Sequence, residues 1–330
     1  MTLRTAATPH LADTQAPIRE RLDAVVDEIR RIVVSDFAPV ETVNEYLLKI
    51  RGKLFRPGLL LLCDQLDGAP TREAETLAAI IELVHLATLV HDDAVDHSVL
   101  RRGMPTVNAL WSHQVAIIMG DYLYSRSISE ITRLGRIEPI EVIAHAANAM
   151  TVGEMRQLSS HDALDFGEDD YYRLIDSKTA SLMGAACELG ALTGAPEHRE
   201  RLRSFGRELG LAFQIADDLL DYTADSRVTG KPTGLDLREH KVTLPLIAVL
   251  PGLSRGERAA VDALFADPEP DDERIGAVVD VVRSRGGLEH ARLAALECAA
   301  RAEDALRGLP EGPELDALRA SIVYAVERRR

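Results

Sequence analysis

The chain has 330 residues, of which 46% are apolar, and its formal net charge is −15 at pH 7. This acidic balance argues against a nucleic-acid-binding protein, which would need a clustered basic face to neutralise phosphates. The cysteines Cys63, Cys187 and Cys298 are odd in number and lie in apolar segments, which favours free thiols in a reducing compartment. The first 17 residues lack a signal-peptide-like run and no uncharged apolar stretch reaches about 20 residues, so we expect a cytoplasmic protein without a stable membrane anchor.

Apolar residues recur with helical spacing along most of the chain, and prolines fall between these segments. In chain order, long helices are expected at residues 72–96, 105–133, 139–161 and 199–221, each of about 20 residues or more. Pro245 is expected in the first turn of another helix. No Ser/Gly-rich linker divides the chain, so we predict an all-α, single-domain bundle of about ten or more helices. Residues 1–16 are expected to form a flexible tail before a helical domain at residues 17–330.

Two Asp-Asp-x-x-Asp clusters follow long apolar stretches of the predicted helices. The first contains Asp92, Asp93 and Asp96, and the second repeats the spacing at residues 217, 218 and 221. Carboxylates four residues apart lie on one helical face about 6 Å apart along the axis, where they repel one another unless solvated or neutralised by a hard divalent cation. One such cluster is as often solvated surface as a metal site. Two identical clusters favour a pair of opposing magnesium-binding faces at the mouth of an apolar interior.

Basic residues follow each cluster or precede a helix start, where they are placed to bind phosphate oxygens. They are Lys53, Arg56, Arg101, Arg102, Lys178, Lys231 and Lys241. Taken singly, each is also explained as a surface side chain whose charged end reaches water. Their proximity to glycines, as in Gly52-Lys53 and Arg102-Gly103, favours a phosphate-binding role.

These motifs resemble those of the trans-isoprenyl diphosphate synthases. The resemblance is carried by Asp92–Asp96 with Arg101-Arg102-Gly103 and by Gln214–Asp221 with Gly230-Lys231-Pro232. Further segments match in the family's order: Gly52-Lys53-x-x-Arg56-Pro57, His85, Pro105-Thr106-x-Asn108, Ser177-Lys178-Thr179 and Lys241–Leu246. The resemblance implies an orthogonal helical bundle around a central cavity, and the magnesium-dependent head-to-tail condensation of isopentenyl diphosphate with an allylic prenyl diphosphate. It also implies about three Mg²⁺ ions per active site.

The resemblance assigns roles to individual positions. Metal binding, direct or through water, falls to Asp92, Asp93, Asp96, Asp217, Asp218 and Asp221. Isopentenyl diphosphate is expected at Lys53, Arg56, His85 and Arg102, and the allylic diphosphate at Arg101, Lys178, Lys231 and Lys241. Thr179 and Gln214 are expected beside the reacting carbons, where their dipoles stabilise positive charge. The segment from Arg51 to Arg56 departs from the family by lacking a second glycine and another basic residue, which affects the expected shape of the isopentenyl pocket.

Product length is expected to depend on Ala87 and Thr88, which stand five and four positions before the first cluster. In the family, side chains at these positions form part of the floor of the product tunnel. Both are small here, so a growing chain can pass deeper, toward Val84, Leu83 and Ile80. We therefore predict an all-trans product of hexaprenyl to decaprenyl length, with heptaprenyl or octaprenyl favoured.

Other readings of the sequence remain open. The enzyme is alternatively a short-chain farnesyl or geranylgeranyl diphosphate synthase, or a terpene cyclase or head-to-head synthase. A cyclase would lack the early Gly-Lys-x-x-Arg site. A non-enzymatic alternative is a catalytically silent subunit of a heteromeric synthase, against which the intact acid clusters argue. The resemblance implies a homodimer, and we expect transient membrane contact during product release.

Overall fold

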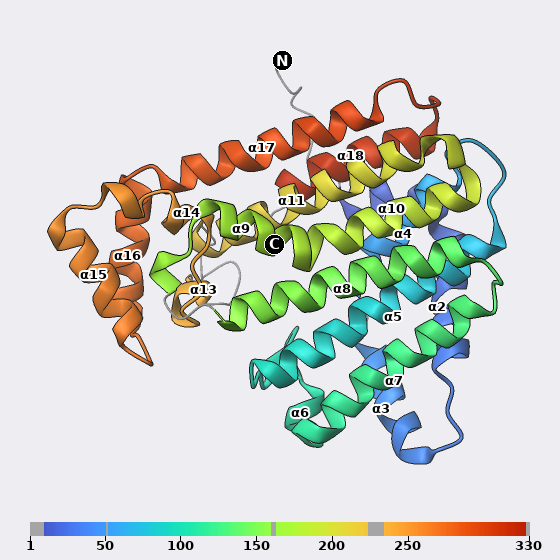
Figure 1. The fold of residues 1–330 in the computed structure, drawn as a ribbon, viewed down its shortest axis with the longest axis horizontal. Coiled ribbons are helices and arrows are strands. Elements are labelled where there is room, and N and C mark those ends of the chain that lie inside the picture. The colour runs from blue at the N-terminus through green and yellow to red at the C-terminus, as the bar shows by residue number, and fades with distance from the viewer. Residues whose placement is uncertain (1–9, 51, 160–162, 224–233, 328–330) are drawn as a thin grey trace.

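A computed structural model describes residues 10–50, 52–159, 163–223 and 234–327. Within this part of the chain nearly all regular structure is helical (Figure 1). The longer helices are α2 (Arg19–Val33), α3 (Ala38–Lys49), α4 (Phe55–Asp64), α5 (Arg72–Val95), α7 (His113–Thr132), α8 (Ile137–Ser159), α9 (Glu168–Ile175), α10 (Ser181–Gly194), α11 (Arg199–Thr223), α15 (Arg255–Ala266), α16 (Asp272–Ser284), α17 (Gly287–Leu306) and α18 (Pro313–Glu327).

Short elements join these helices. They are α1 (Leu11–Thr14), η1 (Ala16–Ile18), β1 (Leu100–Arg101), β2 (Met104–Pro105), α6 (Val107–Leu110), η2 (Ala163–Asp165), η3 (Asp176–Ala180), η4 (Pro196–His198), α13 (Leu235–Arg238), α14 (Leu244–Ile247) and η5 (Leu250–Gly252). Pro245 lies in the first turn of α14, as predicted. The strands β1 and β2 form a minimal antiparallel hairpin whose turn residues Arg102 and Gly103 have φ of 52° and 76°. Two consecutive positive φ values are typical of a tight type I′ turn.

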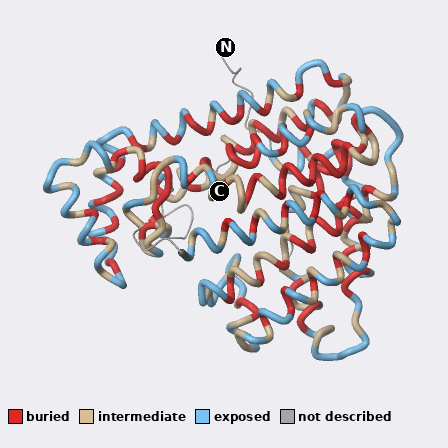
Figure 2. The backbone as a smooth tube through the Cα atoms, viewed as in Figure 1, coloured by how far each residue is buried: buried red, intermediate tan, exposed pale blue. Residues whose placement is uncertain are grey.

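Helix α5 lies in the middle of the bundle and positions the first acid cluster. Thr71 caps its N-terminus by accepting a hydrogen bond from the Ala74 amide. Its apolar residues, such as Leu77 and Ile80, are fully buried. The helix packs against α2, α4, α7 and α10, and Figure 2 shows that buried residues gather in the interior of the helical bundle. The helix is long and apolar enough to span a membrane, but 56% of its most apolar window is buried inside the bundle, as expected for a core helix. The helix ends at Val95, so the first cluster stands at its C-terminal end.

Helix α11 carries the second cluster and packs closely on α10 and α17. Two glycines allow this approach on the α10 side. A Cβ at Gly206 would lie 2.6 Å from the carbonyl oxygen of Met183, and one at Gly210 would lie 2.6 Å from Cα of Ala180. Both distances are shorter than non-bonded contacts permit, so side chains at these positions would push the helices apart. The close approach brings α11 against the turn that precedes α10.

Two sequence predictions need correction. The helix expected at residues 105–133 is divided into α6 and α7, because the chain turns at Trp111 and Ser112 begins a new helix by accepting a hydrogen bond from the Val115 amide. The tail expected through residue 16 is helical from Leu11 onward. The Gln15 side-chain amide donates to the Lys53 carbonyl oxygen at 2.9 Å, which ties this segment to the bundle.

Candidate active site

A cavity of about 400 Å³ brings together most of the residues predicted from the sequence. Its walls come from the start of α4, from α5, from the β1–β2 hairpin, from η3 and from α11. The predicted residues that line it are Lys53, Arg56, His85, Thr88, Asp92, Arg101, Arg102, Lys178, Thr179, Gln214 and Asp217. One carboxylate from each acid cluster therefore faces the same cavity as the predicted phosphate-binding bases.

The first acid cluster divides into residues with different surroundings. Asp92 lines the cavity, and burial raises its pKa to about 6. Asp93 is buried, and Nε of Arg101 donates to both of its carboxylate oxygens at 2.9 Å, with Nη2 of Arg101 2.8 Å from Oδ1. Asp96 is exposed at the end of α5. Asp93 thus holds the hairpin arginine, whereas Asp92 faces the cavity.

The second cluster divides in a similar way. Asp217 lines the cavity. Asp218 is buried, where it accepts hydrogen bonds from the Tyr171 hydroxyl at 2.6 Å and from Nε2 of Gln214 at 2.8 Å. Burial raises the pKa of Asp218 to about 7. Asp221 accepts the backbone N–H groups of Leu235 and Asp236 at 3.1 and 3.0 Å, and so caps the start of α13.

The turn η3 presents Lys178 and Thr179 to the cavity. It is a single π-helical turn between α9 and α10, a feature that often occurs at functional sites. The Thr179 hydroxyl donates to Oε1 of Gln214 at 2.8 Å, and Nε2 of Gln214 donates to Oδ1 of Asp218 at 2.8 Å. This chain of hydrogen bonds fixes which end of the Gln214 amide faces each neighbour.

Helix α8 supplies two polar residues that the sequence analysis missed. Glu154 forms an ion pair with Lys178, and Nζ of Lys178 also donates to Oε1 of Gln157 at 3.0 Å. The spacing Glu-x-x-Gln places both side chains on one helical face, which was the available signal. Asp236, also missed, lies near the second cluster, and burial raises its pKa to about 8.

The basic wall lies around the start of α4. Leu54 has a left-handed backbone, with φ of 48°, at the N-cap between Lys53 and Arg56. Within the part of the chain that the structure describes, the buried Nε atom of Arg56 has no hydrogen-bond partner. An unpaired buried donor costs free energy of folding unless a ligand supplies an acceptor. Burial, together with the positive charge of Arg56, lowers the pKa of His85 well below its usual value. His85 is therefore neutral at pH 7, and the wall is suited to an anion.

Glu82 was also missed by the sequence analysis. It lines the cavity beside this basic wall, and a Cβ at Gly52 would lie 2.5 Å from its Oε1 atom. Burial raises the pKa of Glu82, while the charges of Arg56 and Arg102 act in the opposite direction. Glutamate is common on helices, so Glu82 gave no clear signal in the sequence. A side chain at Gly52 would require the Glu82 carboxylate to move aside.

The donor set suits magnesium, which prefers carboxylate oxygens and commonly binds one or two of them together with substrate phosphates and water. Asp92 and Asp217 offer such oxygens to one cavity. Within the described ranges, one group of three possible ligands, Asp67, Glu197 and His198, has its donor atoms within 4.8 Å of one another, and it lies at the surface, outside the cavity. Among the described residues, the carboxylate oxygens of neither aspartate cluster lie within 4.8 Å of one another as a group of three. Metal ions at the cavity would therefore need further oxygens from a bound ligand.

The remaining predicted residues lie elsewhere. Lys241 is part-buried and pairs with Glu239 at 2.7 Å, and it is not among the residues that line the cavity. Lys231 lies outside the described residues. Ala87 is buried in the bundle, whereas Thr88 borders the cavity and donates its hydroxyl to the His85 carbonyl oxygen.

Comparison with known proteins identifies the family of this chain. The sequence profile of the family described as "Polyprenyl synthetase" matches residues 38–282. The chain is 38% identical to the all-trans-nonaprenyl-diphosphate synthase (geranyl-diphosphate specific) of Rhodobacter capsulatus, over 93% of this chain and 94% of that protein. It is 35% identical to the heptaprenyl diphosphate synthase component 2 of Geobacillus stearothermophilus, over 94% and 97%.

A solved structure shares the whole architecture. The decaprenyl diphosphate synthase from Rhodobacter capsulatus superposes with a TM-score of 0.91 at 37% sequence identity, covering 97% of this chain and 100% of that chain. Fold and site together define an all-α trans-prenyltransferase. The chain belongs to the polyprenyl synthetase family.

Proposed function

We propose that the protein catalyses the magnesium-dependent, head-to-tail condensation of isopentenyl diphosphate with an allylic prenyl diphosphate, and that it releases an all-trans medium- or long-chain polyprenyl diphosphate. The observation that carries this proposal is the cavity in which Asp92 of α5 and Asp217 of α11 face the basic wall at Lys53, Arg56 and His85. One diphosphate would be held at the acid faces through magnesium ions, which balance the negative charge on both sides, and a second diphosphate would bind the bases directly.

The basic wall binds isopentenyl diphosphate in this proposal. Arg56 offers its unpartnered Nε–H, Lys53 and Arg102 add positive charge, and neutral His85 supplies a hydrogen bond without further repulsion. The left-handed turn at Leu54 places Lys53 and Arg56 on either side of the same bend. The substrate is thereby held with its double bond toward the centre of the cavity.

The allylic diphosphate lies toward Asp92, Asp217 and Lys178. Magnesium supplies charge neutralisation of the leaving diphosphate. Glu154 and Gln157 orient the Lys178 ammonium group, which contacts the same phosphate oxygens. We propose about three ions, with Asp92, Asp96 and Asp217 as the principal ligands, as the family resemblance implies. Asp93, Asp218 and Asp221 support them indirectly through the contacts that already occupy their carboxylates.

The centre of the cavity stabilises positive charge. The carbonyl oxygen of Gln214 and the hydroxyl oxygen of Thr179 present negative ends of dipoles beside the expected reacting carbons. Because Asp218 fixes the amide of Gln214, these dipoles are oriented before the substrate binds. In this proposal, the proton that is lost when the new double bond forms passes to the released diphosphate.

The product is proposed to be of medium or long chain length. The small Thr88 side chain borders the cavity, so an allylic tail meets no aromatic ring at that position, while Phe55, Phe213 and Tyr324 line other parts of the cavity. The names of the Rhodobacter and Geobacillus relatives, nonaprenyl and heptaprenyl synthases, agree with this length.

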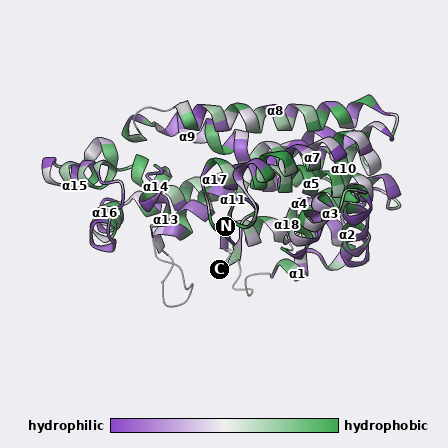
Figure 3. Ribbon diagram, turned by 90° about the horizontal axis from the view of Figure 1, so that it is seen from below, coloured by the Kyte–Doolittle hydropathy of each residue, from purple (hydrophilic) through white to green (hydrophobic). Residues whose placement is uncertain are grey.

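We also propose a homodimer. Large apolar side chains are exposed on the adjacent helices α7 and α8, with exposed fractions of 47% for Ile117, 61% for Ile118 and 56% for Leu158. Figure 3 shows α8 along one face of the molecule. Sedimentation equilibrium should give twice the chain mass for the wild type, and Ile118→Asp should shift the mass toward that of the monomer.

A heteromeric assembly is the second candidate, because one relative is named as component 2. In that case the pure chain alone would show no turnover.

Substrate requirement tests the proposed reaction. The purified protein is incubated with magnesium and farnesyl diphosphate, with and without isopentenyl diphosphate, and the products are read by mass spectrometry. Condensation requires both substrates and stops in EDTA. Consumption of farnesyl diphosphate alone would instead indicate a cyclase. The cytoplasmic location expected from the sequence and a transient membrane contact for product release stay predictions.

A further inference from the structure

An ion pair outside the active-site cavity holds the start of η3. Nε of Arg207, on α11, donates to Oδ1 of Asp176 at 2.7 Å, and Asp176 is the first residue of that turn. The two side chains are 48% and 37% exposed, and neither lines the active-site cavity. Lys178 and Thr179, which do line it, follow Asp176 within the same turn. The ion pair therefore lies beside the site without being part of its wall.

One face of α11 contacts η3 at three points. Arg207 pairs with the start of the turn, as described above. The absence of a side chain at Gly210 admits Ala180, since a Cβ at Gly210 would lie 2.6 Å from Cα of Ala180. Gln214 accepts the hydroxyl hydrogen bond of Thr179. Residues 207, 210 and 214 are spaced by three and four, so they form one stripe along the helix.

Helix α8 confines the same turn. A Cβ at Gly153 would lie 2.7 Å from Cβ of Ser177, so the two elements are in close contact. A single π-helical turn is a rare conformation, and its neighbours decide whether it persists. Because α8 and α11 both press on it, the turn cannot shift without displacing Lys178 and Thr179.

Buried Glu208 anchors Arg207 from its other side. Nη1 of Arg207 donates to Oε1 of Glu208 at 3.3 Å, and Nε of Arg301, on α17, donates to Oε2 at 2.7 Å. The guanidinium group of Arg207 thus lies between a buried carboxylate and Asp176, which restricts its orientation. Since Arg301 still pairs with Glu208, loss of Arg207 leaves no buried charge alone.

We propose that Arg207 and Asp176 are positioning residues, which fix η3 so that the Lys178 ammonium group meets the allylic diphosphate. The role of Lys178 in this statement rests on the proposed function. A partly exposed ion pair contributes little to stability, whereas a displacement of about 1 Å at a reacting group slows a reaction up to about a hundredfold. Loss of the pair should therefore change the rate far more than the stability.

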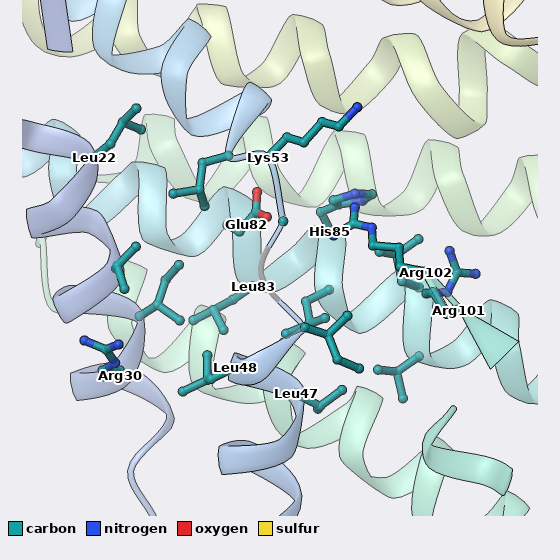
Figure 4. A pocket seen from close by; sticks show the side chains of 18 of the residues that line it. Leu22, Arg30, Leu47, Leu48, Lys53, Glu82, Leu83, His85, Arg101 and Arg102 are labelled. Atoms are coloured by element: carbon teal, nitrogen blue, oxygen red, sulfur yellow. The ribbon is translucent and has the colours of Figure 1, made fainter. Parts of the chain in front are cut away.

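The effect should be confined to the allylic half of the site. The bases proposed for isopentenyl diphosphate come from the start of α4, from α5 and from the β1–β2 hairpin. Figure 4 shows three of them, Lys53, His85 and Arg102, gathered at one end of a neighbouring cavity. They belong to other elements than η3 and α11. We therefore expect a lower kcat and a higher KM for the allylic substrate, with the KM for isopentenyl diphosphate within about twofold of the wild-type value.

Steady-state kinetics with magnesium, farnesyl diphosphate and isopentenyl diphosphate test the proposal. Arg207→Gln and Asp176→Ala remove the pair from either side, and the double variant completes the cycle. The control, Arg203→Gln, is the same substitution about one turn earlier on α11, where Arg203 pairs with Glu200 of its own helix. Each single variant should lower kcat at least about fivefold, and the double variant no further. Arg207→Lys, which keeps the positive charge, should recover at least about half of the wild-type kcat.

Hydrogen exchange tests the turn without turnover. In the full-length protein without substrates, mass spectrometry of peptides over residues 176–180 should show amide exchange at least about fivefold faster in Arg207→Gln and unchanged in Arg203→Gln. If the wild type performs no condensation, the proposed function fails, while this measurement still decides whether the ion pair holds η3.

Four results would overturn the proposal. They are additive losses in the double variant, an equal rise in the KM of both substrates, unchanged exchange over η3, and a loss of rate that follows a lower midpoint of urea denaturation. The last result would reduce the pair to a merely structural role. If Arg207→Gln does not fold, Asp176→Ala decides the question, because Arg207 then keeps its contact with Glu208.

Discussion

The hydroxyl of Tyr171 donates a hydrogen bond to Oδ2 of Asp218 at 2.6 Å, and both residues are buried. This contact joins α9 to the second acid cluster on α11. Through Nε2 of Gln214, which donates to the other oxygen of Asp218, it reaches the centre of the active-site cavity. The middle aspartate of the cluster is therefore part of a buried polar network that orients Gln214.

Removal of the Tyr171 hydroxyl should destabilise the fold. In Tyr171→Phe, one oxygen of buried Asp218 loses its partner, which costs about 1–3 kcal/mol in the free energy of unfolding. Tyr172→Phe, at the neighbouring half-buried tyrosine, is the control and should cost less than about 0.5 kcal/mol. Urea denaturation followed by circular dichroism measures both. Equal stability of the two variants would contradict a structural role for the Tyr171–Asp218 bond.

The outer aspartates of the second cluster should respond differently to the same substitution. Asp221→Asn weakens the bonds that cap α13, so it should lower stability by about 1 kcal/mol and reduce turnover modestly. Asp217→Asn, at the cavity wall, should leave stability nearly unchanged and lower kcat at least a hundredfold. Thermal denaturation and steady-state rates separate the two effects. A reversed pattern would show that Asp221, not Asp217, is the main metal-facing residue.

Magnesium dependence should change with pH through Asp92. Its pKa is raised to about 6 by burial, and magnesium requires the ionised carboxylate. Above pH 6 most Asp92 carboxylates are ionised, so pH has little effect on the magnesium requirement. At pH 5 only about one tenth of them are ionised. The magnesium concentration for half-maximal rate should therefore rise about tenfold at pH 5. Titration of magnesium with free isopentenyl diphosphate over the same range corrects for the substrate. A corrected requirement that does not vary from pH 5 to 7.5 would be inconsistent with this account.

A large side chain at position 88 should shorten the product with less loss of stability than one at position 87. Thr88 borders the cavity, so Thr88→Phe places a ring in the path of the tail and should shorten the product to about three or four isoprene units with little loss of stability. Ala87→Phe should also shorten it, but insertion of a ring at a buried position costs about 1–3 kcal/mol or more. Mass spectrometry of the products and thermal denaturation measure both effects. An unchanged product from folded Thr88→Phe would place the tail elsewhere.

Helical periodicity was enough to predict the long elements. The helix expected at residues 72–96 is α5, and the one expected at 199–221 is α11. Spacing also predicted that the acid clusters would lie on helices, and packing of those helices brings Asp92 and Asp217 to one cavity. The break at Trp111 was not predicted, because it depends on capping by Ser112 within a segment that is apolar throughout.

The different contacts of the three aspartates within each cluster could not be predicted from their spacing. Asp93 is occupied by Arg101 of the hairpin, and Asp221 by the amides of α13, so both depend on segments that fold back onto the helices. The pairing of Glu154 on α8 with Lys178 could not be predicted, since the Glu-x-x-Gln spacing places Glu154 and Gln157 on one helical face but does not say what that face contacts. A second cavity, of about 540 Å³, lies between α2, α3 and α5 (Figure 4), and it too depends on how these helices pack.

The most direct test of the account is the condensation itself in three proteins. Wild type, Asp92→Asn and Asp217→Asn are each incubated with magnesium, isopentenyl diphosphate and farnesyl diphosphate, and the products are separated and weighed by mass spectrometry. We predict a ladder of prenyl diphosphates that ends at seven or eight units in the wild type and is at least a hundredfold weaker in both folded variants. Condensation at the wild-type rate in either variant would contradict the central claim that these two carboxylates form opposing walls of the active site.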